Sequence, residues 1–429
     1  MTRNKPWTAV SKALVAVTAM LIVTLVLASG TAAAGTFKIL HVFKNTDGAG
    51  PNALISDAAG NLYGTTYSGG DLSCFPPQGC GVVFKLAPNP DGTWTESVLY
   101  AFTHGIEGYF PAPGLILDAA GNLYGATTDG GAYGSGVVFK LEPKADETWT
   151  ASVLYSSSGG HLNGGLISDV AGNLYGTTYG GGLENAGSVF KLASNADGSW
   201  TESVLYSFEG FSDGDLPQAG VIFDGAGNLY GTTPLGGDEE CSIPEDRGCG
   251  VVFKLAPNAD GSWTESVLYS FTLKADGGYP SFAGLTFDAA GNLYGTTPNG
   301  GDLKCAPTAG CGVVFKLAPA SGSWSETVLH TFTGEPSENP AAGVIFDAAG
   351  NLYGTTYGTT SGSGLPINYG SVFRLTPTSS GWSYCVLHRF MDLPGEYPNA
   401  AMIMDAAGNL YGTATGVGTN YGLVFEITP

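Results

Sequence analysis

The sequence predicts an all-β fold, a seven-bladed β-propeller with four strands in each blade, and three observations predict it. One ten-residue phrase, DAAGNLYGTT at Asp57–Thr66, recurs in near-identical form seven times. Each copy lies in a longer unit with four short segments rich in β-forming residues. The two ends of the repeat region also complement each other, because one end supplies the segment that the other lacks. Units of this length and kind are typical of blades arranged around an axis.

The repeat varies in length but not in order. Its phrase is marked by one asparagine, found at Asn61, Asn122, Asn173, Asn228, Asn292, Asn351 and Asn409. The spacings are therefore 61, 51, 55, 64, 59 and 58 residues. The fourth unit shows the order of segments: Gly220-VIFD, Asn228-LYGTT, Gly250-VVFKL and Trp263-TESVLYSF. β-branched and aromatic residues bounded by turn residues predict four strands, and no segment shows sustained helical periodicity.

The phrase itself is interpreted as a turn between the first two strands of a blade. Its aspartate can accept hydrogen bonds from turn amides, and its glycine and asparagine tolerate a positive φ. The glycine after the tyrosine lets a neighbouring ring or backbone approach closely. One carboxylate and one amide in each copy fall short of the six to eight oxygen ligands of calcium. The phrase is therefore scaffolding, and Ca²⁺ elsewhere in the chain is the one cofactor left open.

Closure of the ring is predicted from the two ends. The last unit stops after a third segment, Leu423-VFEI, and the first unit begins with a lone fourth segment, Phe37-KILHVF. An open solenoid is the alternative, but it would need distinct polar caps at both ends. We therefore expect residues 35–429 to form one domain in which the N-terminal strand completes the last blade.

Residues 1–34 have the pattern of a cleaved signal peptide. Arg3, Lys5 and Lys12 precede an apolar run from Ala13 to Ala28, and three alanines end at Ala34. An uncleaved anchor is the alternative, but the run is shorter than the ~20 residues that a membrane span needs. We expect a secreted protein, extracellular or periplasmic, without membrane insertion.

The chain is strongly acidic. It has 16 Lys and Arg against 37 Asp and Glu, a net charge of −21. Removing residues 1–34 takes away three basic residues and no acidic ones, which leaves 13 against 37 and a net charge of −24. Such a surface repels nucleic acid and anionic lipid. An extracellular glycan or a protein is the expected partner, and the protein is expected to be a monomer.

Six of the seven cysteines form three local pairs, each across a short loop: Cys74 with Cys80, Cys241 with Cys249, and Cys305 with Cys311. Export to an oxidising compartment favours disulfides. Zinc is the alternative, but it usually needs four ligands, and these loops offer two sulfurs and no histidine. No metal site is therefore assigned. The seventh, Cys385, stands at the repeat position of Ser97 and Ser203 and is expected to be a lone thiol in a strand.

The recurring GNLYGTT, GVVFKL and SVLYSF phrases resemble those of the exported tandem-repeat proteins called GloVer repeat proteins, some of which are grouped as choice-of-anchor proteins. The resemblance covers residues 35–429. Their layout is also similar to NHL-type propellers, whose repeats carry a similar D-x-x-G-N turn. Anchored members end in a sorting tail, and no such tail is expected after Glu426-ITP. The resemblance implies secretion and a propeller fold, and it implies no established activity.

Sequence variation between the copies is concentrated in two kinds of loop, which are expected on one face of the propeller. One kind joins the second and third strands, and includes an insertion that begins at Ser361. The other kind joins successive blades. Binding residues concentrate on variable loops held by a rigid frame, and the candidates are Glu107, Tyr109, Phe110, Phe211, Asp213, Asp215, Asp276, Tyr279, Glu396 and Tyr397. Rings beside carboxylates suit sugars. The alternative is that these rings pack on the prolines that follow them.

Catalytic residues are not indicated. His41, His330 and His388 stand where other copies have tyrosine, so they are expected in strands. His104 and His161 lie in successive loops between blades, where a base or a metal site is an open alternative. No phosphate loop, nucleophile elbow or HExxH motif is present.

The repeated lysine of VFKL is predicted to form cross-strand charge pairs with Glu96, Glu202 and Glu265, which follow a lysine by eleven residues.

Together these features predict a secreted binding or scaffold module of the cell envelope or extracellular space, with its ligand on the variable-loop face. The first alternative is an extracellular carbohydrate-active hydrolase, lyase or lactonase that uses loop-face carboxylates with or without Ca²⁺. The second alternative is a protein-interaction hub. A propeller hosts unrelated functions, so the fold does not choose among them.

Overall fold

The structure is a computed structural model that describes residues 36–238, 241, 248–280, 282, 284–305, 309–334, 338–358, 369–391, 395–416 and 421–429. The predicted signal peptide, residues 1–34, and most of the insertion that begins at Ser361 lie outside these residues. All of the described residues belong to one compact unit, residues 34–429. Nowhere in the described ranges is there a helix long and apolar enough to cross a membrane.

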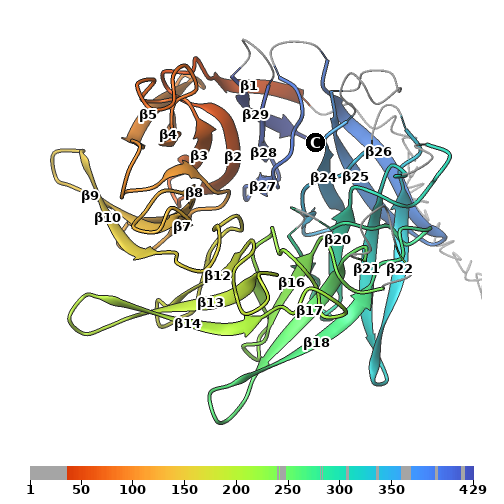
Figure 1. The fold of residues 1–429 in the computed structure, drawn as a ribbon. Helices are drawn as coiled ribbons and strands as arrows, with labels where there is room; N and C mark the ends of the chain where they lie inside the picture. The colour runs from red at the N-terminus through yellow and green to blue at the C-terminus, as the bar shows by residue number, and fades with distance from the viewer. Residues whose placement is uncertain are drawn as a thin grey trace, which may run out of the picture. The chain divides into compact units, whose positions relative to one another are not determined.

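Seven antiparallel sheets are arranged around an axis as the blades of a propeller (Figure 1). Blades 1 and 2 consist of β2 (Ala49–Ser56), β3 (Leu62–Ser68), β4 (Val82–Pro88) and β5 (Trp94–Ala101), then β7 (Ile116–Leu117), β8 (Leu123–Asp129), β9 (Val137–Pro143) and β10 (Trp149–Ser156). A short strand, β6 (Tyr109–Pro111), also pairs with β8. Blades 3 and 4 consist of β11 (Ile167–Ser168), β12 (Leu174–Thr178), β13 (Ser188–Ser194) and β14 (Trp200–Ser207), then β15 (Ile222–Phe223), β16 (Leu229–Thr233), β17 (Val251–Pro257) and β18 (Trp263–Ser270).

Blades 5 and 6 consist of β19 (Thr286–Phe287), β20 (Leu293–Thr297), β21 (Val313–Ala320) and β22 (Ser323–Thr331), then β23 (Ile345–Phe346), β24 (Leu352–Thr356), β25 (Ser371–Thr378) and β26 (Gly381–Arg389). Blade 7 consists of β27 (Ile403–Met404), β28 (Leu410–Ala414), β29 (Leu423–Thr428) and β1 (Thr36–Val42). The first strand of a blade lies nearest the centre and the fourth lies outermost (Figure 1).

The N-terminal strand closes the ring, as predicted. β1 pairs antiparallel with β29, and the register places Phe37 opposite Ile427 and Val42 opposite Leu423. The last blade is thus built from both ends of the described unit, so the ring has no open seam between blade 7 and blade 1.

The recurring phrase forms the turn that was predicted from it. Asp57 Oδ1 accepts hydrogen bonds from the backbone amides of Ala59 and Asn61, and its Oδ2 accepts bonds from the Asn61 side chain and the Tyr63 hydroxyl. Burial alone would raise the pKa of Asp57, but these hydrogen bonds outweigh it and lower the pKa. The same four bonds recur in each of the other copies, from Asp118 to Asp405.

The glycine that follows the tyrosine makes room for a ring. A Cβ on Gly64 would lie 2.6 Å from the tip of the Phe84 ring, which is fully buried. Equivalent phenylalanines are buried in the third strand of every blade, and a phenylalanine of the preceding blade meets most of them edge to face. Phe43 contacts Phe84 in this way with 5.1 Å between ring centroids, and Phe102 contacts Phe139 at 5.2 Å. These pairs connect one blade to the next.

The predicted cross-strand charge pairs are wrong. Lys85 is in register with Ser97, while Glu96 is opposite Leu86, so the lysine and the glutamate point to opposite faces of the sheet. The lysine instead lies over the ring of Tyr63, with 5.7 Å between its Nζ and the ring centre. The glutamate faces the preceding blade, where its environment includes Asp47.

Candidate functional site

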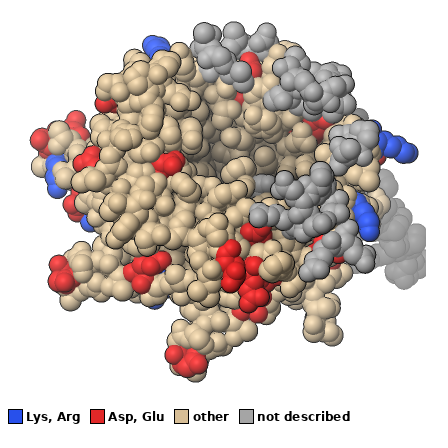
Figure 2. All heavy atoms as spheres, in the orientation of Figure 1, with Lys and Arg blue, Asp and Glu red and all other residues tan. Residues whose placement is uncertain are grey.

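The described residues enclose a cavity of about 630 Å³ at the centre of the ring. Figure 2 shows the hollow, with mostly uncharged residues around it. Its walls are made by residues in or just before the first strands of several blades, by the ends of β3 and β8, and by Tyr179, which follows β12. These segments belong to the variable-loop side of the blades, so the cavity opens where variation between copies is greatest.

Six of the seven loops between blades, all but the one between blades 2 and 3, share an unusual backbone feature. A proline stands at the same position in each of these loops, and the residue before it has a positive φ. This conformation is strained for any residue other than glycine. The residues are Phe110, Leu216, Tyr279, Asn339 and Tyr397, with φ between 53° and 57°, and Gly50 in the closing loop with φ of 64°. The amide of this residue then bonds to the loop before a third strand, as from Tyr279 N to Cys249 O at 2.8 Å. These six crossovers, the loops that join one blade to the next, are fixed in this way before they enter the cavity wall.

Three amide side chains in the wall are available to a ligand. Asn163, Gln218 and Asn399 line the cavity from blades 3, 4 and 7, and none of them has a hydrogen-bond partner among the described residues. Asn52 differs, because its Nδ2 donates to Thr65 Oγ1 and to the Pro111 carbonyl, both at 3.0 Å. An amide offers both donors and an acceptor, so the three unused amides suit a ligand with hydroxyl groups.

Aromatic rings complete the wall. Tyr67 is 46% exposed, and one face of its ring stacks on Phe110 with centroids 4.7 Å apart and an interplanar angle of 13°. Phe110 is in turn stacked on Phe75, at 5.5 Å. Tyr179 and the exposed Phe282 also line the cavity. Because Phe110 holds the Tyr67 ring from behind, Tyr67 is a preorganised surface for a flat apolar group.

One histidine and one carboxylate meet at the edge of the cavity. His161 Nδ1 lies 2.9 Å from the Thr128 carbonyl and 3.5 Å from Asp129 Oδ1. The Thr128 hydroxyl donates to Asp129 Oδ2 at 2.7 Å. The carbonyl can only accept, so it favours the tautomer with a proton on Nδ1 and leaves Nε2 as a proton acceptor. His161 was an open alternative from the sequence, and Asp129 was not expected.

Three of the carboxylates predicted as ligand contacts instead accept hydrogen bonds that hold the loops between blades. The hydroxyl of Tyr206 donates to Asp213 Oδ2 at 2.8 Å, and that of Tyr269 donates to Asp276 Oδ2 at 3.1 Å. Tyr100 donates to Glu107 in the same way. Asp276 also accepts bonds from the amide and hydroxyl of Thr272. These side chains therefore tie the end of a fourth strand to the loop that follows it.

The other residues predicted as ligand contacts lie at different depths. Asp215, Glu396 and Tyr397 are 4%, 5% and 5% exposed, so they are beneath the surface. Tyr109 and Tyr279 are partly buried, and Phe211 is 66% exposed. The whole predicted set, Glu107, Tyr109, Phe110, Phe211, Asp213, Asp215, Asp276, Tyr279, Glu396 and Tyr397, lies outside the cavity lining. Phe110 is the member closest to it in function, because it backs Tyr67.

The three disulfides are present. The bonds Cys74–Cys80, Cys241–Cys249 and Cys305–Cys311 join residues with Cα atoms 5.6, 5.7 and 5.9 Å apart. Cys385 is free and lies opposite Arg374, at the position expected from its alignment with Ser97.

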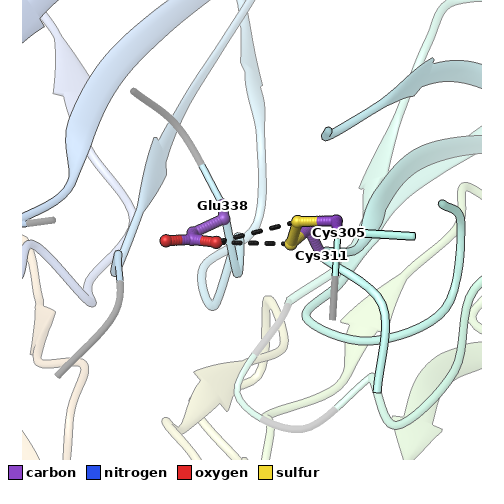
Figure 3. A group of neighbouring side chains, drawn as sticks. All are labelled: Cys305, Cys311 and Glu338. Carbon is purple, nitrogen blue, oxygen red and sulfur yellow. Dashed lines mark hydrogen bonds between the residues drawn. A yellow bond between two sulfur atoms is a disulfide. The ribbon is translucent and has the colours of Figure 1, made fainter. Parts of the chain in front are cut away.

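One disulfide lies beside a buried acid (Figure 3). Glu338 is 1% exposed, and its Oε2 is 3.3 Å from Cys311 Sγ and 3.8 Å from Cys305 Sγ. These three residues are close enough to suggest a metal site. However, the sulfurs of a disulfide are not thiolates, which are the form that binds metal. In the oxidised protein this cluster therefore does not act as a metal centre.

A second group of carboxylates lies between blades at the outer strands. Burial raises the pKa of Glu265 to about 7, and the nearby Asp213 adds to the shift. Glu326 has a pKa of about 7 for the same reasons, with Asp276 as the neighbour. Each of these glutamates has one buried oxygen without a hydrogen-bond partner among the described residues.

Sequence reasoning missed the cavity residues because they are ordinary residue types. The available signal was the position directly after the repeated phrase, which is Tyr67, Thr128 and Tyr179 in the first three copies and proline in the next two. This position varies between copies, whereas the phrase before it hardly changes. Such variation indicates contact with something other than the scaffold.

Comparison with known proteins agrees with the repeat pattern. The sequence matches the family model described as the Gloeobacter/Verrucomicrobia repeat over residues 26–244 and again over residues 241–429. No curated protein matches the sequence.

Solved structures resemble this chain at low sequence identity. A provisionally assigned gluconolactonase is 15% identical over 92% of this chain and 92% of that one, with a TM-score of 0.41. A protein of unknown function from Dyadobacter fermentans is 11% identical over 91% and 96%, with a TM-score of 0.46. A provisionally assigned 6-phosphogluconolactonase from Bacteroides uniformis is 14% identical over 77% and 84%, with a TM-score of 0.48. Likeness at this level carries no information on activity.

Proposed function

We propose that this chain, which belongs to the Gloeobacter/Verrucomicrobia repeat family, is an exported binding protein. Its central cavity takes a small, uncharged, hydroxyl-rich ligand, such as a mono- or disaccharide. Three disulfides support export, because such bonds persist in oxidising compartments.

The cavity is the observation that carries the proposal. Its volume of about 630 Å³ falls within the range of roughly 300–1,000 Å³ that is usual for small-molecule sites. It lies at the centre of a rigid ring, and its walls come from blades that are far apart in the sequence. A site of this kind is preformed, which lowers the entropic cost of binding.

The charge of the lining selects an uncharged ligand. Among the described lining residues there is no lysine or arginine, and Asp129 is the one carboxylate. Phosphate and carboxylate ligands normally require a cation or an array of backbone amides. A neutral ligand needs neither, and the net charge of the chain also disfavours anions.

The polar and aromatic groups fit the two sides of a sugar ring. Tyr67 offers a flat apolar surface for the C–H face, and Asn163, Gln218 and Asn399 offer donors and acceptors for the hydroxyls. This division between one stacking ring and a few placed amides is usual for small-ligand pockets.

A second candidate function is hydrolysis of a carbohydrate ester or lactone in the same cavity, and the His161–Asp129 pair favours it. With Nδ1–H directed to the Thr128 carbonyl, Nε2 is a base that could activate a water molecule. In this function the cavity would bind the substrate as above, and His161→Gln would abolish turnover while binding remained.

The experiment is a glycan array followed by calorimetry on the purified mature protein, with and without EDTA. For a sugar that binds, Tyr67→Ala is expected to weaken affinity about 5- to 10-fold, in line with roughly 1 kcal/mol for an aromatic contact. Asn163→Ala is expected to weaken it to a similar degree without lowering the melting temperature, since its amide has no partner among the described residues.

The matched control is Tyr133→Ala, because Tyr133 is 68% exposed in a variable loop and does not line the cavity. Its affinity should equal that of the wild type. If Tyr133→Ala weakens binding and Tyr67→Ala does not, the ligand binds to the loops and not in the cavity. If only proteins are captured and no sugar binds, an interaction hub replaces this proposal.

A further inference from the structure

Neighbouring blades meet through one recurring pair of positions on their outer strands. The first position is the tyrosine of SVLYSF near the end of a fourth strand. The second is the residue opposite the leucine of VFKL in the next blade, as Glu265 is opposite Leu255. Between blades 3 and 4 these are Tyr206 and Glu265, with Asp213 of the crossover beside both.

The next seam is built in the same way. Tyr269 of blade 4 meets Glu326 of blade 5, and Asp276 lies next to them. In both seams the tyrosine hydroxyl donates a hydrogen bond to the aspartate, so the aspartate has a protein partner.

The seam between blade 7 and blade 1 departs from this pattern in one residue. His41 of β1 occupies the tyrosine position, opposite Val424, while Asp47 and Glu96 supply the same two carboxylates. His41 Nε2 lies 3.3 Å from Asp47 Oδ2. One atom from each of the three residues lies within 4.8 Å of the other two.

Two of these atoms are buried and without a partner. His41 Nε2 and Glu96 Oε1 are inaccessible to solvent, and neither has a hydrogen-bond partner among the described residues. Glu265 Oε1 and Glu326 Oε1 of the tyrosine seams are unpartnered in the same way, so His41 Nε2 is the atom that distinguishes this seam. Leaving such atoms unpaired is costly, so a buried polar atom without a partner needs an explanation. The tyrosine hydroxyl of the other two seams is absent here, and the His41 ring faces Asp47 Oδ2 in its place.

We propose that His41, Asp47 and Glu96 form a binding site for a divalent first-row metal ion, such as Zn²⁺, which fastens the N-terminal closing strand to blade 1. An imidazole and two carboxylates are ligands that Zn²⁺ takes at 2.0–2.2 Å, with further positions left for water. Atoms held around such an ion are about 3–4 Å from one another, so small side-chain shifts bring these three into place.

The surroundings hold the three ligands toward one point. The His41 ring meets Phe43 edge to face, with centroids 4.7 Å apart, which fixes the plane of the imidazole. Asp47 Oδ1 accepts a bond from the Lys44 amide at 2.6 Å, so its Oδ2 is the oxygen that faces His41. A group that fixes the orientation of a ligand in this way is usual around metal sites.

The position of the site gives the ion a structural role. His41 lies on β1, which belongs to blade 7, and Glu96 lies on β5 of blade 1. An ion bound by both would join the two ends of the ring across its closing seam. Metal binding to the folded state alone stabilises that state.

The experiment measures Zn²⁺ binding by calorimetry, and melting temperature with Zn²⁺ or EDTA, on the oxidised mature protein. We expect one ion per chain and a higher melting temperature with Zn²⁺. His41→Tyr should fold, because tyrosine stands at this position in other blades, and should lose both the binding and the Zn²⁺-dependent shift. Glu96→Ala should also fold, because Ala151 holds the equivalent position of blade 2, and it should weaken binding at least 10-fold.

The matched control is His330→Tyr. His330 occupies the same repeat position between blades 5 and 6, but its ring stacks on Tyr384 and is not flanked by carboxylates in the described seam. Zn²⁺ binding of this variant should equal that of the wild type. The proposal is overturned if the wild type binds no Zn²⁺, or if His41→Tyr binds it as the wild type does.

Discussion

The ring of Phe37 lies flat on the imidazole of His388, with 3.7 Å between centroids and an interplanar angle of 3°. This contact joins β1 in blade 7 to β26 in blade 6. The same pair of repeat positions brings His330 onto Tyr384 at 4.1 Å between blades 5 and 6. These blades therefore meet at the same pair of repeat positions. In some seams the two positions hold stacked rings, and in others they hold a tyrosine hydroxyl and carboxylates.

Replacing Phe37 with Ala is expected to lower the free energy of unfolding by about 2 kcal/mol, because the change removes the stack on His388 and contacts with Phe390 and Phe425. Urea unfolding followed by tryptophan fluorescence would measure it. Thr36→Ala on the same strand is the control, since Thr36 is exposed. Equal stability of the two variants would mean that β1 does not hold the ring closed.

The fold was predictable from sequence because local and global signals agree. The repeated turn, the strand pattern and the complementary ends all specify the same blade, and the register of β1 on β29 confirms the last of these. The lysine and glutamate pairing was wrong because an eleven-residue spacing does not fix the register. The hairpin places Lys85 opposite Ser97, and that one-residue difference turns Glu96 to the other face.

Two glutamates and two histidines should make the stability of the protein depend on pH in opposite directions. The pKa of Glu265 and of Glu326 is raised from 4.5 to about 7 in the folded state. The folded state therefore holds protons that the unfolded state releases, so their contribution to stability falls as the pH rises from about 4.5 to about 7. Changing both to Gln should remove this fall and stabilise the protein at pH 7.5 by less than about 1 kcal/mol per site, since both are only half-buried.

The histidines act in the opposite direction. Burial lowers the pKa of His330 and of His388 from 6.5 to about 4. Their contribution to stability is lost as the pH falls from about 6.5 to about 4, because the unfolded state takes up protons first. Replacing both with Tyr should remove this loss. Urea unfolding at pH 4.5, 6 and 7.5 compares the two double variants, and parallel pH profiles would contradict the assignment.

The turn face should contribute to stability and not to binding. Asp224→Ala removes the acceptor for Ala226 N, for the backbone and side chain of Asn228 and for the Tyr230 hydroxyl. A loss of about 1–3 kcal/mol is expected from groups left without partners. Thermal melting measures it, and any sugar that binds the wild type should bind the variant equally well once it is folded. If the fully folded variant loses affinity for the sugar, the ligand binds on the turn face and not in the cavity.

The candidate site was less predictable than the fold. The cavity is lined by loops of the face that varies between copies, but the acidic and aromatic residues singled out there mostly hold the crossovers. Asp276 accepts bonds from Tyr269 and Thr272, and Tyr397 is buried. Asn163, Gln218 and Tyr67 line the cavity instead, and they come together only when separate blades meet at the centre. One sequence does not show which residues meet there.

Reduction of the disulfides should loosen loops without unfolding the propeller. Cys74–Cys80, Cys241–Cys249 and Cys305–Cys311 close loops with sequence separations of 6, 8 and 6 residues. Loops this short are expected to contribute no more than about 2–3 kcal/mol each. Melting with and without reductant should show a lower temperature but one cooperative transition. Peptide mapping that found these thiols free in the exported protein would contradict the assignment.

The last prediction separates packing from binding at the crossovers. Tyr279 has a φ of 56° and packs against the cluster that contains Cys249 and Phe271. Tyr279→Gly removes the ring without straining the backbone, because Gly50 holds the equivalent position in the closing crossover at a φ of 64°. If the ring packs, the variant melts earlier and keeps the wild-type affinity for a sugar. If the ring stacks on the ligand, affinity falls about 5-fold, as for an aromatic contact, while Tyr67→Ala leaves it unchanged. We expect the first result, because the ring lies outside the cavity lining and packs against this cluster.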